Sequence, residues 1–185
     1  MGIEFAEQSN TEVSALPVED QRTVQSLVDE ILRGIPGYRA ESYDGILHIS
    51  NPILEADPRN FLNLRISEFV ISNASVFDAD EMLKLKIEMT LHPERYSGGW
   101  NGGYGAPSGH IFNTNNITIS DRNLSVREIL NKIIVANGNA LWVARLSPSK
   151  LLQDDTFFPT YPDEGVKSPS FHWQFLPFAS VKNNR

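Results

Sequence analysis

The segment SGGWNGGYGAPSG, residues 97–109, combines six glycines with a tryptophan and a tyrosine. A phosphate-binding P-loop needs a lysine followed by a hydroxyl residue, and the segment contains no lysine. A dinucleotide fingerprint needs a strand before it and a helix after it, which is the reverse of the order expected around this segment. A nucleophile elbow needs glycines two positions either side of its serine, and Pro107 directly precedes Ser108. Two interpretations remain open. The segment is a flexible connector, or Trp100, Asn101 and Tyr104 form an aromatic platform for a sugar ring.

The histidines and acidic residues do not fall into a metal-binding or catalytic pattern. No pair of histidines has the H-x-x-x-H spacing of a zinc site, so we expect neither a metal nor a cofactor. Three acidic residues cluster in the segment that follows Asn73 and Ser75, and we expect them in the first turn of a helix: Asp78, Asp80 and Glu81. His48 is expected on the outer face of a hairpin, opposite Glu41, as a surface pair.

Composition restricts the classes of function. The chain has 185 residues, a formal net charge of −7 and no cysteine. A nucleic-acid surface needs clustered Lys and Arg, so nucleic-acid binding is not expected. Disulfides and thiolate chemistry are excluded. No apolar stretch approaches the roughly 20 residues of a membrane span, and the first sixteen residues do not resemble a signal peptide. We therefore expect no membrane insertion. We expect a periplasmic or secreted location, from a chain whose signal peptide has been removed.

Hydrophobic periodicity and turn residues predict an α+β fold, in which about three helices pack on a small mixed sheet. The helices are predicted over 18–33, 76–91 and 126–137. Within 76–91 the stretch LKLKIEMTL also alternates like a strand, but the length of the segment and Asp80-Glu81 near its start favour a helix. Asp44-Gly45 is typical of a two-residue hairpin turn between strands, and a loop is predicted from Asn51-Pro52 to Asn60. A strand over 61–72 is expected to carry a bulge or break near Ser67-Glu68.

A strand–helix–strand unit over 117–146 is the clearest local pattern. Ser125 and Glu128 have the spacing of a capping box, and Gly138 stands where a helix-terminating glycine belongs. A buried stripe is predicted on the helix: Val126, Ile129, Leu130, Ile133 and Ile134. Residues 1–146 are accordingly expected to form one α+β module.

The remaining residues, 147–185, contain five of the eleven prolines and a cluster of aromatic residues. We expect an extended C-terminal arm that lies on its own domain or on a neighbour. Its candidate partner-binding residues are Phe171, Trp173 and Phe175.

Short stretches of the chain repeat one another. VQSLVDEILRGIPGYRAE and VREILNKIIVANGNALWV each suggest a helix, a glycine-containing break and a strand. VISNASVFDADEML and ISDRNLSVREIL share an Asn-x-Ser-Val entry into a helix. Two explanations of these similarities remain open. One is internal duplication, and the other is that strand ends, N-caps and helix starts favour the same residues wherever they occur.

The segment from Val24 to Ser50 resembles the second half of the short N-terminal domain of secretins and TonB-dependent receptors (STN-like). The matching residues are Leu27, Ile31, Leu32, Gly37, Tyr38, Arg39, Asp44 and Gly45. The unit from Ile117 to Arg145 is similar to the strand–helix–strand pattern of the same family. The resemblance covers about a third of the chain, and the Gly-rich segment has no counterpart in it. It implies a small α/β module of the bacterial envelope that contacts partner proteins and carries out no catalysis.

These observations lead to a non-enzymatic protein-interaction module of the bacterial cell envelope. An exposed sheet edge or the aromatic arm would bind another envelope protein or a second copy of the chain. One alternative is a carbohydrate- or peptidoglycan-binding domain that uses Trp100, Asn101 and Tyr104. A second alternative is a hydrolase whose site is assembled from scattered residues.

Overall fold

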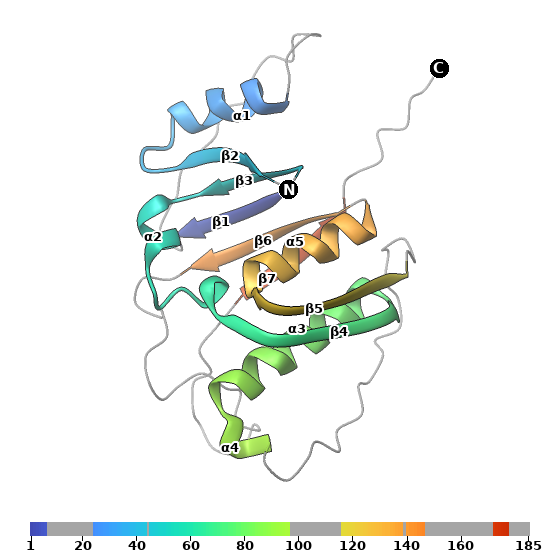
Figure 1. Ribbon diagram of the computed structural model, residues 1–185. Coiled ribbons are helices and arrows are strands. Elements are labelled where there is room, and N and C mark those ends of the chain that lie inside the picture. Colours follow the sequence, from blue (N-terminus) through green and yellow to red (C-terminus); the bar gives the residue numbers. More distant parts are fainter. Residues whose placement is uncertain (7–23, 44, 97–115, 139, 147–171, 178–185) are drawn as a thin grey trace, which may run out of the picture. The chain divides into compact units, whose positions relative to one another are not determined.

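A computed structural model describes residues 1–6, 24–43, 45–96, 116–138, 140–146 and 172–177 (Figure 1). The chain divides into two compact units. Unit 1 consists of Met1–Phe61 and Val143–Gln174, and unit 2 of Leu62–Trp142 and Phe175–Arg185. Helices and strands are mixed throughout, so the predicted α+β class is confirmed.

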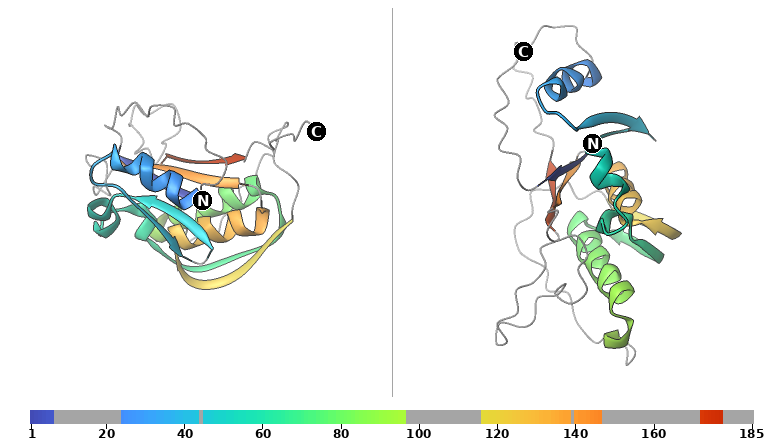
Figure 2. Two further views of the ribbon diagram at one scale, coloured as in Figure 1. Left: turned by 90° about the horizontal axis from the view of Figure 1, so that it is seen from above. Right: turned by 90° about the vertical axis from the view of Figure 1, so that its left-hand side faces the viewer.

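Five strands form a mixed sheet in the order β2-β3-β1-β6-β7 (Figures 1 and 2). Their bounds are β1 Gly2–Ala6, β2 Arg39–Tyr43, β3 Ile46–Ser50, β6 Ala140–Leu146 and β7 His172–Pro177. β1 runs parallel to β3, whereas β2 and β3 are antiparallel. Among the described residues, β2 and β7 are thus the outer strands of this sheet.

The hairpin of β2 and β3 has the predicted register, with Glu41 opposite His48 and Ala40 opposite Ile49. Gly45 has a φ of 75°, a conformation that costs glycine little and other residues more. The expected exposure of His48 is wrong, because the side chain is only 7% exposed. The face of β3 that carries Ile46, His48 and Ser50 is the buried one, so the hairpin face predicted to be outside is turned inward.

β1 is an element that the sequence analysis missed. Its five residues, GIEFA, alternate apolar and other residues over too short a run to stand out. Hydrogen bonds to its two neighbours, β3 and β6, stabilise the strand, because local propensity alone is too weak to do so. Glu4 of this strand is 1% exposed, which is rare for a carboxylate.

Two predicted segments of unit 1 differ in extent or type. Helix α1 spans Val24–Arg33 and packs against β2, and it ends at the predicted residue. Residues 18–23 of the predicted helix lie outside the described residues. The predicted loop from Asn51 to Asn60 contains a short helix, α2, over Pro52–Ala56. Asn51 caps it and proline occupies its first position, so the residues taken for turn formers are the start of a helix.

Unit 2 is built around an antiparallel strand pair, β4 Arg65–Ala74 and β5 Ile117–Ser125. Helix α3, Val76–Leu91, packs against β4, and helix α5, Val126–Asn137, packs against β5 and α3. The short helix α4, Pro93–Tyr96, was not predicted. The predicted helices over 76–91 and 126–137 are confirmed, and the whole predicted stripe of α5 is buried.

The predicted strand over 61–72 is displaced. Phe61–Asn63 form a 3-10 turn, and β4 begins at Arg65. The irregularity in the register falls between Ile71 and Ala74 instead of near Ser67-Glu68. Apolar alternation does not separate a turn with buried side chains from a strand, and both Phe61 and Leu62 are buried.

The two strand-to-helix turns of unit 2 share one geometry. Asn73 and Asn123 are the two non-glycine residues with positive φ among the described residues, and both have a φ of 53°. Two positions later Ser75 and Ser125 each form a capping box, with Asp78 and Glu128 respectively. The Asn-x-Ser-Val echo in the sequence therefore corresponds to the same backbone path at both turns.

The capping box of α5 predicts a dependence of stability on pH. Burial raises the pKa of Glu128, but hydrogen bonds from the Ser125 amide and hydroxyl, at 2.6 and 2.8 Å, lower it, as do the charges of Arg65 and Arg127. The net pKa lies below the usual value of 4.5. A carboxylate whose folded pKa is depressed stabilises the protein above its unfolded pKa, and this contribution is lost as pH falls through the folded pKa.

Glu128→Gln keeps the shape of the side chain and removes its charge. We expect the free energy of unfolding at pH 7 to fall by about 0.5 kcal/mol, the usual contribution of a charge at a helix N-terminus. Urea titrations at several pH values should show that the free energies of unfolding of the two proteins converge as the pH falls below 4.5, because wild-type Glu128 takes up its proton there. An equal loss at pH 7 and at low pH would contradict this account.

Much of the predicted arm, 147–171 and 178–185, lies outside the described residues, so the division into residues 1–146 and an arm over 147–185 stays a prediction. The described part of the arm is β7. Within the described ranges, the helices are too short or too polar to cross a bilayer.

Candidate functional site

Three buried polar side chains share one face of β1 and β3. Glu4, His48 and Ser50 are all buried. Gly2 lies beside His48 and Ile3 beside Ile49 in the parallel pairing. Side chains alternate between faces along a strand, so Glu4 is on the same face as His48 and Ser50. Unit 1 therefore contains a polar layer where an apolar core is usual.

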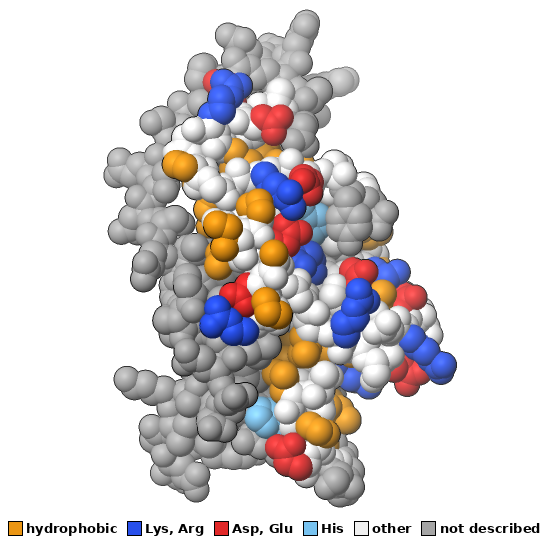
Figure 3. Space-filling model, turned by 60° about the vertical axis from the view of Figure 1, so that its left-hand side comes forward, with side chains coloured by type: hydrophobic (Ala, Val, Ile, Leu, Met, Phe, Trp, Pro, Cys, Tyr) orange, Lys and Arg blue, Asp and Glu red, His pale blue; other side chains and the backbone are white. Residues whose placement is uncertain are grey.

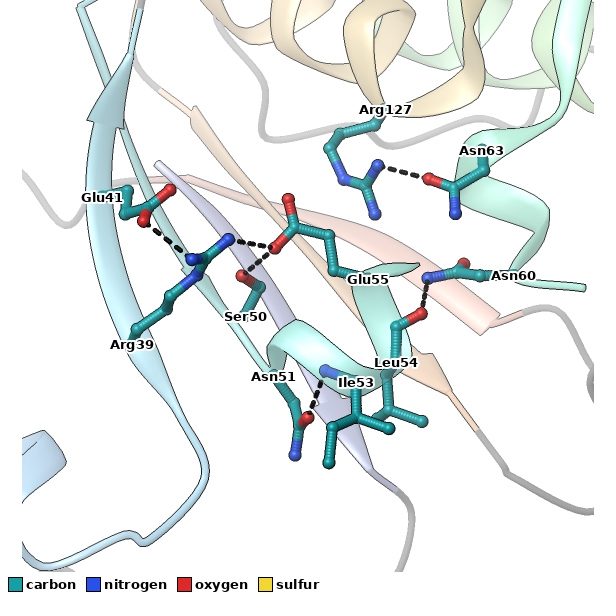
Figure 4. Close-up of polar contacts among 10 residues, drawn as sticks. All are labelled: Arg39, Glu41, Ser50, Asn51, Ile53, Leu54, Glu55, Asn60, Asn63 and Arg127. Carbon is teal, nitrogen blue, oxygen red and sulfur yellow. Dashed lines mark hydrogen bonds and ion pairs between the residues drawn. The ribbon is translucent and has the colours of Figure 1, made fainter. Parts of the chain in front are cut away.

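An ion-pair network adjoins this layer (Figure 4). Glu55 of α2 accepts a hydrogen bond from the Ser50 hydroxyl at 2.9 Å and from Arg39 Nη2 at 3.2 Å. Arg39 also lies 3.0 Å from the Glu41 carboxylate. Arg39 is the cross-strand partner of Ser50, which explains why one carboxylate reaches both. The network ties α2 to the hairpin.

Helix α2 is held at both ends. The Asn51 side chain accepts a hydrogen bond from the Ile53 amide at 3.0 Å, and the Asn60 amide donates to the Leu54 carbonyl at 2.9 Å (Figure 4). A Cβ added at Gly37 would lie 3.4 Å from Asn51 Nδ2, which places the turn before β2 directly beside the N-cap. A five-residue helix thus has a fixed position.

The arrangement of Ser50 does not suit nucleophilic catalysis. An activated serine passes its proton to a basic partner and stands open to substrate. Ser50 instead donates to a carboxylate that also pairs with Arg39, and the serine is buried. The geometry clamps α2 in place, and the hydrolase hypothesis gains no support from it.

The residues predicted as sites are placed only in part. Trp100, Asn101, Tyr104 and Ser108 fall in 97–115, which lies outside the described residues. Phe171 also lies outside the described residues. The glycan hypothesis and the choice between connector and platform therefore stay predictions. Trp173 and Phe175 lie in β7. Trp173 is 8% exposed and stacks on Phe61, with ring centroids 5.7 Å apart, while Phe175 is half-buried. Binding of a partner by these aromatic residues stays a prediction.

Another histidine and two acidic residues of α3 pair with nearby side chains. His92 ends α3 and lies 3.2 Å from the Glu94 carboxylate. Asp80 and Glu81 lie 2.7 and 2.8 Å from Lys84. Among the described residues, no group of three His, Asp or Glu side chains is arranged to hold a metal ion.

An apolar surface at α2 was missed by the sequence analysis. Ile53 is 82% exposed, the highest value among the large hydrophobic residues described as exposed. The apolar residues on either side of Ile53 in α2, Pro52 and Leu54, are half-buried, and with Ile53 we call them the Ile53 surface. Figure 3 brings forward the side on which Figure 1 draws α2, and hydrophobic side chains there lie between groups of both charges. The sequence predicts a loop for this segment, and a loop has no predicted exposed face.

Comparisons of the chain with known protein families, with curated proteins and with solved structures find no match.

Proposed function

We propose that the protein is a non-enzymatic protein-interaction module of the bacterial cell envelope, and that the Ile53 surface is its binding site. The observation that carries the proposal is the exposure of Ile53 on a helix that is fixed in position. Single exposed apolar side chains are common. Several that lie together are unfavourable in water and indicate an interaction site. A fixed surface loses little conformational entropy on binding.

Two further features support the proposal. The order of helix α1, Gly37-Tyr38-Arg39 and hairpin agrees with the resemblance to the short N-terminal domain of secretins and TonB-dependent receptors, from which the envelope location is inferred. β2 and β7 are outer strands of the sheet, and a partner's strand that pairs with such an edge would add to the apolar contact.

Site-specific photo-cross-linking tests the proposal. A photoreactive phenylalanine derivative replaces Ile53 in the full chain, and cells that naturally contain the protein are irradiated. We expect a discrete protein adduct that is recovered with the envelope fraction. Val135 of α5, which is 61% exposed, is the matched control position and should give no such adduct. The absence of an adduct at Ile53, or the same adducts at both positions, would refute the binding site. Recovery with the cytoplasm would refute the location.

A further inference from the structure

We infer that the edge of β6 is a binding site for an extended segment of a partner protein, and that β7 occupies this site as an internal competitor. In the strand order β2-β3-β1-β6-β7, β7 is the one described strand on that side of β6. Without β7, β6 would be an outer strand with a row of unpaired N–H and C=O groups. This site is separate from the Ile53 surface.

β7 is held in the way that recognition domains hold an extended peptide. Its backbone pairs with a single strand, β6. One large side chain is buried, because Trp173 stacks on Phe61 with ring centroids 5.7 Å apart, whereas the next residue, Gln174, is exposed. Phe61 belongs to the 3-10 turn and not to the sheet, so a second element besides β6 contacts Trp173. In this mode of binding, main-chain hydrogen bonds provide affinity and a pocket for a side chain provides specificity.

The two outer strands of the sheet are attached differently. Two residues, Asp44 and Gly45, connect β2 to β3, and helix α1 packs against β2. Residues 147–171 separate β7 from β6 in the sequence. Departure of β2 from the sheet would disrupt a tight turn and the packing of α1, whereas departure of β7 would leave both in place. β7 is therefore the strand that a competitor can replace.

The sequence of β7, HWQFLP, indicates which partner fits the edge. Alternate residues of a strand lie on one face, and here they include two aromatic residues, the buried Trp173 and the half-buried Phe175. A competing segment therefore needs an extended backbone and a tryptophan or phenylalanine that stacks on Phe61. A strand of the same chain competes at an effective concentration on the order of millimolar. This favours a separate partner with a tighter-binding segment over the β7 of a second copy.

Peptide binding to the full chain tests the inference. The probe is a fluorescently labelled peptide with the sequence of β7, HWQFLP, and fluorescence anisotropy reports its binding. Binding to the wild-type chain should be weak, because β7 competes for the edge. Trp173→Ala removes the ring that holds β7 on Phe61, so this variant should bind the peptide at least about 10-fold more tightly. Val70→Ala, at a half-exposed position of β4, should bind it as the wild-type chain does.

Two controls determine where the peptide binds. A peptide with alanine in place of tryptophan should not bind, and Phe61→Leu added to Trp173→Ala should weaken binding, because the stacking partner is lost. Circular dichroism verifies that each variant is folded, and Trp173→Leu replaces Trp173→Ala if the latter is not. Absence of binding to the folded Trp173 variant at millimolar peptide overturns the inference, as does equal binding of the alanine peptide.

Sedimentation equilibrium distinguishes a separate partner from a second copy. The wild-type chain should sediment as a monomer of 20.8 kDa at micromolar concentration. A dimer that Trp173→Ala abolishes would indicate exchange of β7 between copies and would overturn the assignment to a separate partner. Cross-linking at Ile53 probes a different surface, so failure at the β6 edge and failure of the proposed function are observed separately.

Discussion

Replacement of Trp142 by alanine is expected to lower the free energy of unfolding by about 3–5 kcal/mol, a large share of the stability of a domain this size. Trp142 lies in β6 and is completely buried. Its indole N–H donates to Asn131 Oδ1 of α5 at 2.9 Å, and Asn131 is itself buried. The substitution leaves a cavity and also an amide oxygen without this partner, so the two penalties add. Chemical denaturation followed by circular dichroism measures the loss.

Smaller variants separate the two penalties. Trp142→Phe removes the donor while keeping most of the volume, and Asn131→Ala removes the acceptor. Each should cost about 1–3 kcal/mol, and the double variant should cost less than their sum, because both single variants remove the same hydrogen bond. Val135→Ala, on the exposed side of the same helix, controls for helix propensity and should change stability by less than about 0.5 kcal/mol. Strict additivity of the two buried changes would contradict the hydrogen bond.

Phe61→Ala is expected to cost a similar amount, about 3–5 kcal/mol, and to release β7. Phe61 is buried and stacks on Trp173, with 25° between the ring planes. Aromatic stacking contributes beyond the buried area, and β7 is an outer strand with a sheet neighbour on one side. Hydrogen exchange measured by mass spectrometry should show loss of protection in His172–Pro177 before the rest of the sheet.

Phe61→Leu is the matched control, since it keeps an apolar side chain and removes only the ring stacking. It should lose less stability than Phe61→Ala and should keep part of the protection in β7. Val70→Ala, at a half-exposed position of β4, should leave exchange in β7 unchanged. If β7 stays protected in Phe61→Ala, the stacking does not anchor the strand.

The features predicted correctly from the sequence are those that local residues determine. Ser125, Glu128 and Gly138 mark the start and end of α5, because a capping box and a left-handed glycine each satisfy backbone groups within a few residues. The Asp44-Gly45 pair in the sequence likewise predicts the register that β2 and β3 have.

The features missed depend on residues distant in sequence. Nothing within GIEFA indicates that the strand lies between β3 and β6. The hairpin sequence likewise does not indicate which of its faces is covered, and the covered face is the one that carries His48. The candidate binding surface was missed for another reason. Asn51-Pro52 suits a turn as well as a helix start, and only the contact of Ser50 and Arg39 with Glu55 determines which side of α2 faces outward.

The position of β1 has a consequence for synthesis on the ribosome. β1 is made before one of its two sheet neighbours, β6, which begins only at Ala140. Translation at 5–20 residues per second separates the two by on the order of 10 s. Throughout that interval the nascent chain displays a strand edge that can pair with the wrong neighbour. The carboxyl group of Glu4, in the middle of that strand, opposes such aggregation while synthesis is incomplete. Burial of this group costs free energy when β6 pairs with β1.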